Sequence, residues 1–194
     1  KQLLMFEAPA DVRNTGLLSI DYDDGGKDDD QWLYLPSLRK STRISSSDKS
    51  GSFMGTDLTY ADMTEQDPNT YDYKMLDANA TVGGEACWKI EARANTPKVK
   101  KETGYVKSVM WVSKEKLVPL QVKNWVRDGK KIKYIKFKDI KKVDDLWTAH
   151  TIIARTTRGK TVESTTILQF SEMSYNNADV TPDLFVQSRL EQGL

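Results

Sequence analysis

The sequence contains only one cysteine and one histidine, so the side chains that most often bind metals or act as nucleophiles and bases are nearly absent. Cys87 cannot form a disulfide within the chain and leaves the redox compartment undetermined. His150 lies within a strand-like stretch, where a structural histidine is favoured over a catalytic base. No glycine-rich motif for phosphate binding is present. These scarcities predict no metal site, no cofactor and no enzyme activity.

Neither positive nor negative charge dominates, because the 29 basic and 28 acidic residues nearly cancel. A charged partner must therefore be met by a local patch rather than by the field of the whole protein. The one dense basic run interleaves lysines with Tyr134 and Phe137, a pattern that superficially suits nucleic acid. We favour strand lysines that keep an exposed edge or outer face from pairing with other sheets, and we predict no nucleic-acid partner. These lysines are Lys130, Lys131, Lys133, Lys136, Lys138, Lys141 and Lys142.

Long apolar runs are also missing. No run approaches the roughly 18 residues that a membrane-spanning helix requires, so the sequence predicts no such helix. The chain begins at Lys1 rather than at methionine and enters a strand-like run at once. We therefore expect that an export signal or another leading segment has been removed.

What the sequence has in quantity is short stretches of alternating apolar and polar residues separated by turn signals, the pattern of antiparallel strands. The length of 194 residues suits a single domain over 1–194. We predict a mainly β fold of about ten or eleven strands with few helices. A slip in the alternation between Tyr134 and Ile135 predicts a bulge or a coiled strand. The strand-like stretches are residues 3–7, 12–22, 32–36, 41–45, 71–82, 86–93, 105–113, 118–127, 130–143, 146–156 and 160–173.

The acidic loop over residues 23–30 is typical of a solvated hairpin turn. A calcium-binding loop of the EF-hand type is the alternative. Counting from Asp21, however, Trp32 stands where such a loop needs a bidentate glutamate, and the glycine spacing does not fit either. We therefore favour the hairpin turn.

Two short helices are predicted. Thr56 or Asp57 can cap a helical turn over residues 58–63, because either side chain can accept from the free N–H groups of a first turn. Thr181 followed by Pro182 predicts the start of a C-terminal helix that packs on the sheet.

Residues 46–55 are mostly small and polar, so they predict a loop, yet they include Phe53 and Met54. A purely solvated loop has no reason to display two large apolar side chains. One interpretation is a mobile flap that gates an apolar cavity, and the alternative is a static loop that tucks both side chains into the core. An ion pair between Arg43 and Asp57 would pin this loop to the sheet.

A longer pattern links several of these stretches. It starts with Trp32-Leu33-Tyr34-Leu35-Pro36, continues with Arg39-Lys40 and Arg43, and extends through the run from Ser47 to Tyr60. The pattern resembles the family of outer membrane lipoprotein-sorting proteins, the relatives of LolA, and the resemblance covers nearly the whole chain. It continues through Gly84-Glu85-Ala86-Cys87-Trp88, Gly104-Tyr105, Trp111-Val112, Val118-Pro119-Leu120, Asp183-Leu184-Phe185 and Leu190-Glu191.

The resemblance implies a curved antiparallel sheet that forms an incomplete β-barrel, with helices as lids. It also implies a periplasmic location, lipid or lipoprotein acyl chains as ligands, transient membrane contact and an RND-type transporter as partner. Family members carry a signal sequence and a first helix before the residues that begin this chain, and such a segment could anchor the protein to a membrane. A sensor or interaction module of the cell envelope with the same fold, without cargo transfer, remains the alternative function.

The sequence also suggests which side chains would line the apolar cavity. Five tryptophans are present, and a sheet with one wide apolar face must cover it with helices, close on itself or hold a nonpolar ligand. The candidate lining residues are Trp32, Tyr34, Phe53, Met54, Trp88, Trp111 and Leu168.

Overall fold

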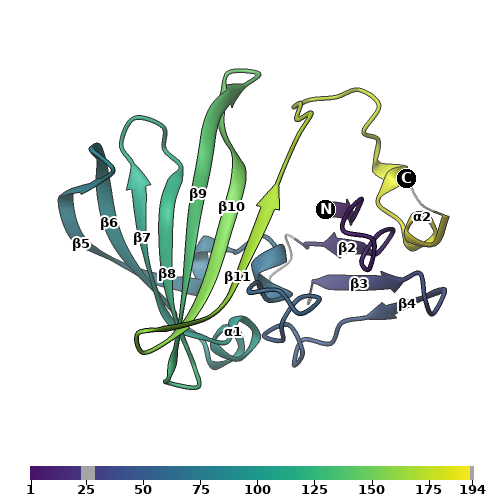
Figure 1. Cartoon of the computed structure of the whole chain (residues 1–194), viewed down its shortest axis with the longest axis horizontal. Helices are drawn as coiled ribbons and strands as arrows, with labels where there is room; N and C mark the ends of the chain where they lie inside the picture. The colour runs from purple at the N-terminus through teal and green to yellow at the C-terminus, as the bar shows by residue number, and fades with distance from the viewer. Residues whose placement is uncertain (23–28, 193–194) are drawn as a thin grey trace. The chain divides into compact units, whose positions relative to one another are not determined.

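The computed structural model describes residues 1–22 and 29–192, and within them the chain forms eleven strands in two antiparallel sheets (Figure 1). The mainly β fold with few helices and the number of strands are therefore confirmed. The acidic loop predicted over residues 23–30 lies largely outside the described residues. The chain divides into two compact units, and the expectation of a single domain stays a prediction.

One unit consists of the described parts of residues 1–49, 61–65 and 176–194 and holds a sheet of four strands, here called the small sheet. Its strands, in spatial order, are β1 (Gln2–Met5), β2 (Gly16–Ile20), β3 (Asp30–Leu35) and β4 (Lys40–Arg43). The hairpin predicted between β2 and β3 is present, since these strands pair from Gly16 with Tyr34 to Ile20 with Asp30.

The C-terminal helix packs on the small sheet. A 3-10 turn, η3 (Pro182–Leu184), follows Thr181, and the α-helix α2 (Gln187–Gln192) begins only afterwards. Leu190 is fully buried beside Gly16, where a Cβ atom would meet its side chain at 2.7 Å. Ser41 donates a hydrogen bond of 2.9 Å to Glu191. The predicted helix is therefore present but shorter.

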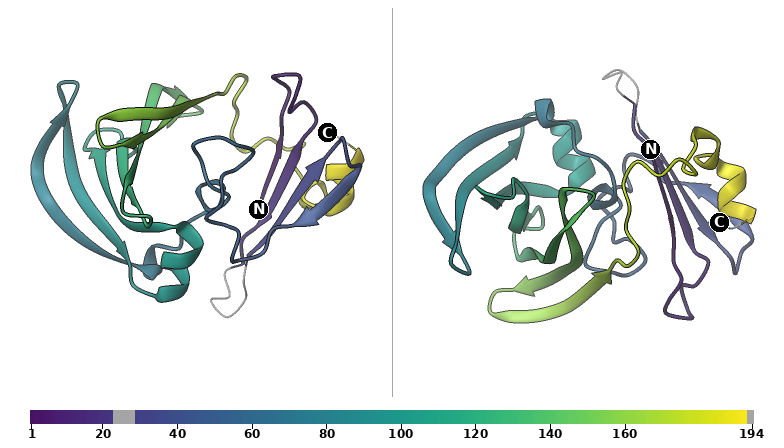
Figure 2. Two further views of the ribbon diagram at one scale, coloured as in Figure 1. Left: turned by 60° about the horizontal axis from the view of Figure 1, so that its bottom comes forward. Right: turned by 90° about the horizontal axis from the view of Figure 1, so that it is seen from above.

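The second unit, residues 50–60 and 66–175, holds a sheet of seven strands, here called the large sheet. Each strand pairs with its neighbours in sequence, so the order runs from β11 at one edge to β5 at the other and the sheet is open. Figure 2 shows its strong curvature. The strands are β5 (Tyr71–Val82), β6 (Glu85–Ala94), β7 (Tyr105–Ser113), β8 (Pro119–Val126), β9 (Lys131–Val143), β10 (Leu146–Arg158) and β11 (Thr161–Gln169).

A helix that the sequence analysis missed, α1 (Pro97–Thr103), connects β6 and β7. Its signals are local. Thr96 accepts a hydrogen bond of 3.2 Å from the backbone N–H of Val99, proline occupies the first turn, and Gly104 ends the helix in the left-handed conformation at φ 71°. A search for capping residues would have found it.

The bulge predicted in β9 is wrong, because the pairings of this strand with β8 and β10 show no change of register. Pairing with β10 keeps one register from Lys131 to Val143, and only the opposed residues Asp139 and His150 are left out of the ladder between them. Asp139 has a φ of 52°, so the backbone is locally irregular there without an extra residue. The alternation changed phase between Tyr134 and Ile135 because both faces of this strand carry apolar side chains, not because its backbone is irregular there.

The helical turn predicted over 58–63 is also wrong. Ser52 and Thr59 form an isolated antiparallel bridge, and the backbone N–H of Phe53 donates to the carbonyl of Leu58 at 2.8 Å. These bonds hold Leu58 in a tight loop, so it cannot belong to a helical turn. The 3-10 turn η1 therefore spans only Ala61–Met63. A further turn, η2 (Pro68–Thr70), precedes β5.

Candidate functional site

The register of the large sheet sorts its side chains onto two faces, because directly paired residues of antiparallel strands point to the same side. One face, here called the apolar face, has a continuous row of paired residues across every strand of the sheet. In order from β5 to β11, the row is Met75, Ile90, Met110, Val122, Ile135, Ala154 and Thr166. Large apolar residues flank this row on the same face, namely Tyr73, Trp88, Val112, Phe137, Ile152 and Leu168.

The apolar face is only partly covered. Ile135 and Ala154 at its centre are buried, whereas Tyr73 and Met75 on the edge strand β5 are 52% and 50% exposed. The other large side chains of the face, such as Trp88, are half-buried. A continuous apolar surface of this kind can lower its free energy by contacting a nonpolar ligand.

A polar cluster around the buried side chain of Asp57 holds the 50–60 segment against this face at β11. The Asp57 carboxylate accepts hydrogen bonds from the hydroxyls of Ser164 and Thr166, and the Asp57 backbone N–H donates to Thr166 at 2.9 Å. Asp57 itself is 5% exposed. Because Ser164 and Thr166 lie 107 and 109 residues from Asp57 in the sequence, the sequence alone did not identify them as partners.

Burial raises the pKa of Asp57, but its hydrogen bonds with Ser164, Thr156 and Thr166 and the charge of Lys133 outweigh this and lower it overall. Lys133 is 5% exposed and donates a hydrogen bond of 2.7 Å to the hydroxyl of Tyr105. The cluster therefore holds a carboxylate and an ammonium group in buried positions. Lys133 lies in the basic run that we assigned to an exposed surface, and for this lysine that assignment is wrong.

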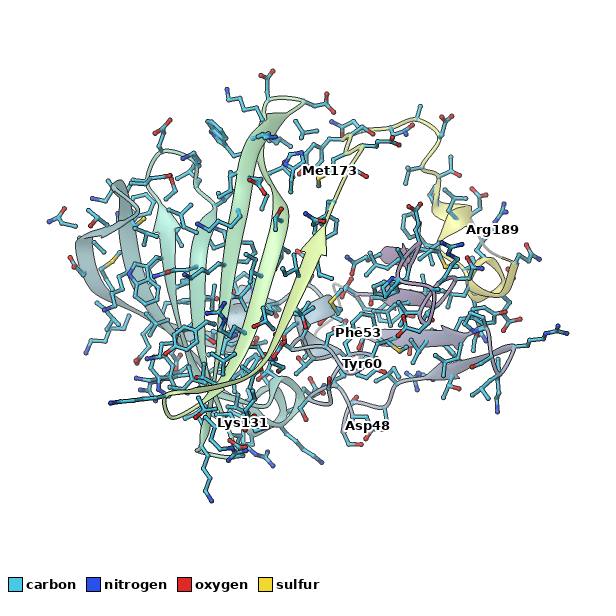
Figure 3. All side chains as sticks on the ribbon, in the orientation of Figure 1. Asp48, Phe53, Tyr60, Lys131, Met173 and Arg189 are labelled. Atoms are coloured by element: carbon cyan, nitrogen blue, oxygen red, sulfur yellow. The ribbon has the colours of Figure 1, made fainter. Side chains whose placement is uncertain are left out.

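Phe53 and Met54 do not behave alike. Phe53 is 1% exposed and makes an edge-to-face contact with Tyr60, with ring centroids 5.4 Å apart; both residues are labelled in Figure 3. Met54 is half-buried and has a φ of 51°. The premise that the loop displays Phe53 is therefore wrong, because the isolated bridge turns this side chain inward.

The candidate lining residues fall in different places. Trp88 and Leu168 lie on the apolar face. Trp111 pairs with Lys89 and so lies on the opposite face, where Lys89 stacks over its ring at 5.2 Å. Trp111 therefore does not share a face with Trp88 and Leu168.

Trp32 and Tyr34 belong to the small sheet. They point to the face that contains Gly16, the residue beside Leu190 of α2. Both side chains are half-buried. The remaining apolar-face residues, such as Ile90 and Met110, were missed, although the alternation of their strands carried the signal.

The ion pair expected between Arg43 and Asp57 is replaced by two separate sets of contacts. Arg43 binds Asp30 through its guanidinium group, with Nε 2.7 Å from Oδ1. This pair joins β3 and β4, whereas Asp57 is satisfied by hydroxyl groups. Arg43 therefore anchors strands of the small sheet, and only Asp57 anchors the loop.

Cys87 and His150 have structural surroundings, as predicted. Cys87 is fully buried, its Sγ donates to the carbonyl of Glu85 at 3.3 Å, and burial raises the pKa of the thiol. His150 Nδ1 lies 3.0 Å from the carbonyl oxygen of Asp139. Over residues 1–22 and 29–192, no group of three or more His, Cys, Asp and Glu side chains could hold a metal ion. In the same ranges, no helix is long and apolar enough to cross a membrane.

Comparison with known proteins gives one family model, described as an uncharacterized protein, that matches residues 1–192. A DUF1329 family protein from Desulfovibrio piger is 31% identical, with a TM-score of 0.84 over 97% of this chain and 75% of that one. A protein from Vibrio parahaemolyticus, described as a putative outer membrane lipoprotein-sorting protein domain, is 28% identical, with a TM-score of 0.77 over 97% and 76%.

A LolA superfamily protein from Nitrosomonas europaea is 18% identical, with a TM-score of 0.67 over 96% of this chain and 76% of that one, and shows the same fold. No curated protein matches the sequence significantly. The resemblance to lipoprotein-sorting proteins that the sequence motifs indicated is confirmed by these structures.

Proposed function

Because the chain belongs to the DUF1329 family and has a LolA-like fold, we propose that it is a periplasmic carrier that binds the acyl chains of lipids or lipoproteins. The observation that supports this most directly is the apolar row across the large sheet, flanked by side chains such as Trp88 and Leu168. These side chains are more exposed than those of a hydrophobic core, and together they form a larger continuous apolar patch than an ordinary protein surface carries.

An acyl chain suits this face on energetic grounds. Removing apolar surface from water contributes on the order of 25 cal/mol per Å², so a long chain in contact with several strands binds without any charged anchor. Tyr73 and Met75 on the edge strand, each about half exposed, offer the contacts that a ligand would complete.

A sensor or interaction module is the second candidate, because it would need the same apolar face. The two functions differ in what happens to the ligand. A carrier releases its lipid to an acceptor membrane or protein, whereas a sensor retains it and changes its contacts with a partner. An RND-type transporter is the partner that the family resemblance proposes for the carrier, with transient membrane contact during transfer. Native mass spectrometry before and after mixing with acceptor vesicles separates carrier from sensor.

The binding face is tested by a matched pair of substitutions on β11. Leu168 lies on the apolar face, and its neighbour Ile167, 58% exposed, lies on the opposite one. Leu168→Asp should weaken binding of a fluorescent fatty acid at least about tenfold, because the carboxylate must lose water beside the acyl chain. Ile167→Asp should leave binding within about twofold. Equal affinities in the two variants, with no lipid found in protein extracted from a membrane-containing host, would refute acyl-chain binding at this face.

A further inference from the structure

The face of the large sheet opposite the apolar face combines lysines with aromatic rings. We call its central part, on β6 to β10, the lysine face. It is continuous in register, since Lys89 pairs with Trp111, Lys107 with Trp125, and Lys123 with Tyr134. The lysine face consists of Lys89, Lys107, Trp111, Lys123, Trp125, Tyr134, Lys136 and Arg155.

The ammonium groups lie over the aromatic rings. The Nζ atoms of Lys107 and Lys123 are each 4.5 Å from the ring centroid of Trp125, and Lys123 is also 5.5 Å from that of Tyr134. Lys89 stands 5.2 Å from the ring of Trp111. The cations are thus held next to amphipathic rings by the pleat of the sheet itself.

Positive charge prevails at the centre of this surface. Glu91 is the acidic residue placed within it by the register, and it pairs with Lys107 at 3.0 Å and with Arg93 at 2.7 Å. The other acidic side chains of this face stand at its margins: Asp72 and Asp77 on the edge strand, Glu85 at the start of β6, where it pairs with Lys116, and Asp139, which accepts a hydrogen bond from Thr151. The whole protein has a net charge of only +1, so this excess is local.

We propose that the lysine face docks on the surface of an anionic phospholipid bilayer. Neighbouring strands are about 4.8 Å apart, so lysines on several strands form a two-dimensional array that can meet many headgroup phosphates at once. Tryptophan and tyrosine favour the interfacial region of a bilayer, where the ring contacts acyl carbons and its polar atom contacts water. A nucleic-acid site would instead place its positive charges along a groove that follows the phosphates of one strand.

Docking is separate from acyl-chain binding, because the two faces of the sheet carry different residues. Leu168→Asp is expected to lose fatty-acid binding and keep vesicle binding. Loss of the lysine face is expected to do the reverse. Failure of one proposal therefore leaves the other standing.

The test is cosedimentation with vesicles of phosphatidylglycerol and phosphatidylcholine, compared with vesicles of phosphatidylcholine alone. The wild type should bind only the anionic vesicles, and less tightly as salt is raised. Lys123→Gln with Lys136→Gln should weaken binding about 25-fold, since each lysine near an anionic surface contributes about fivefold. The matched control, Lys100→Gln with Lys101→Gln, removes two exposed charges from α1 and should change binding less than about twofold.

A second readout needs no variant. Brominated phosphatidylglycerol in the vesicles should quench the tryptophan fluorescence of the bound wild type, because Trp111 and Trp125 lie within the lysine face. Equal weakening in the two double variants would overturn the proposal, and so would failure to bind anionic vesicles at low salt. Tighter binding to duplex DNA or to an acidic polypeptide than to the vesicles would assign the face to that partner instead and also overturn it.

Discussion

The hydroxyl of Thr166 donates a hydrogen bond of 2.9 Å to the carboxylate of Asp57, although 109 residues separate them in the chain. The bond joins a loop to the strand that ends the large sheet. Together with the bond from Ser164, it fixes the segment that covers part of the apolar face. The sequence suggested that a salt bridge to Arg43 anchors Asp57, whereas hydrogen bonds from two strand hydroxyls anchor it in the structure.

Asp57→Asn should lower the free energy of unfolding by about 2 kcal/mol, because the hydroxyls of Ser164 and Thr166 lose a charged acceptor at a buried position. Urea denaturation measures this change. Asp72→Asn, at an exposed position on β5, is the control and should change stability by less than about 0.5 kcal/mol. Similar losses in both variants would show that the Asp57 cluster has no special role.

The pH dependence of this difference follows from the lowered pKa of Asp57. The unfolded chain binds the proton more readily than the folded one, so the stabilisation is fully present above the ordinary carboxyl pKa. It is lost as pH falls through the lowered pKa of the folded state. The stability gap between wild type and Asp57→Asn should therefore narrow on acidification below that ordinary value, and a gap that widens there would contradict this account.

Phe53→Ser should destabilise the ligand-free protein by roughly 2–5 kcal/mol, because it removes a large buried side chain. Met54 has a positive φ, so Met54→Gly removes a strained backbone conformation and should be neutral or stabilising by up to about 1 kcal/mol. Thermal unfolding of both variants checks the contrast. An unchanged melting temperature in Phe53→Ser would restore the idea of a mobile gate.

Gly104→Ala should cost more stability than Gly129→Ala. The two glycines have nearly the same φ, 71° and 72°, so both substitutions carry the left-handed penalty of about 1–2 kcal/mol. A Cβ at Gly104 would in addition lie 2.9 Å from Cβ of Ser50, whereas nothing lies within 4 Å at Gly129. Denaturant unfolding of the pair isolates this contact, and equal losses would argue against close approach of Ser50 to α1.

Trp88→Ala should weaken binding of a fluorescent fatty acid at least about fivefold, since Trp88 lies on the proposed ligand face and an aromatic ring contributes a large apolar contact. Trp111 belongs to the neighbouring residue pair of β6 and β7 and points to the opposite face, so Trp111→Ala is the control and should leave that affinity within about twofold. Fluorescence titration of both variants measures this. A larger effect of Trp111→Ala would show that the ligand binds to the face opposite the apolar face, and would contradict the proposal.

Local signals were sufficient for most elements. Tyr105–Ser113 was predicted with the observed bounds, and Tyr71–Val82 likewise, because alternation and flanking turn residues act over a few positions. The missed helix α1 also had local signals. The bulge wrongly predicted in β9 shows where local signals fail, since apolar residues on both faces of this strand resemble a change of backbone phase.

By itself, the sequence determined the antiparallel β class, the approximate strand number, the hairpin order and the family, because periodicity, turn residues and motifs are properties of neighbouring positions. The tertiary structure alone decided that the strands divide into two sheets and that Trp88 and Trp111 point to opposite faces. It also decided that Asp57 binds Ser164 and Thr166 and that Lys133 is buried. Such facts depend on the register between strands far apart in sequence, where a shift of one residue moves every side chain to the other face.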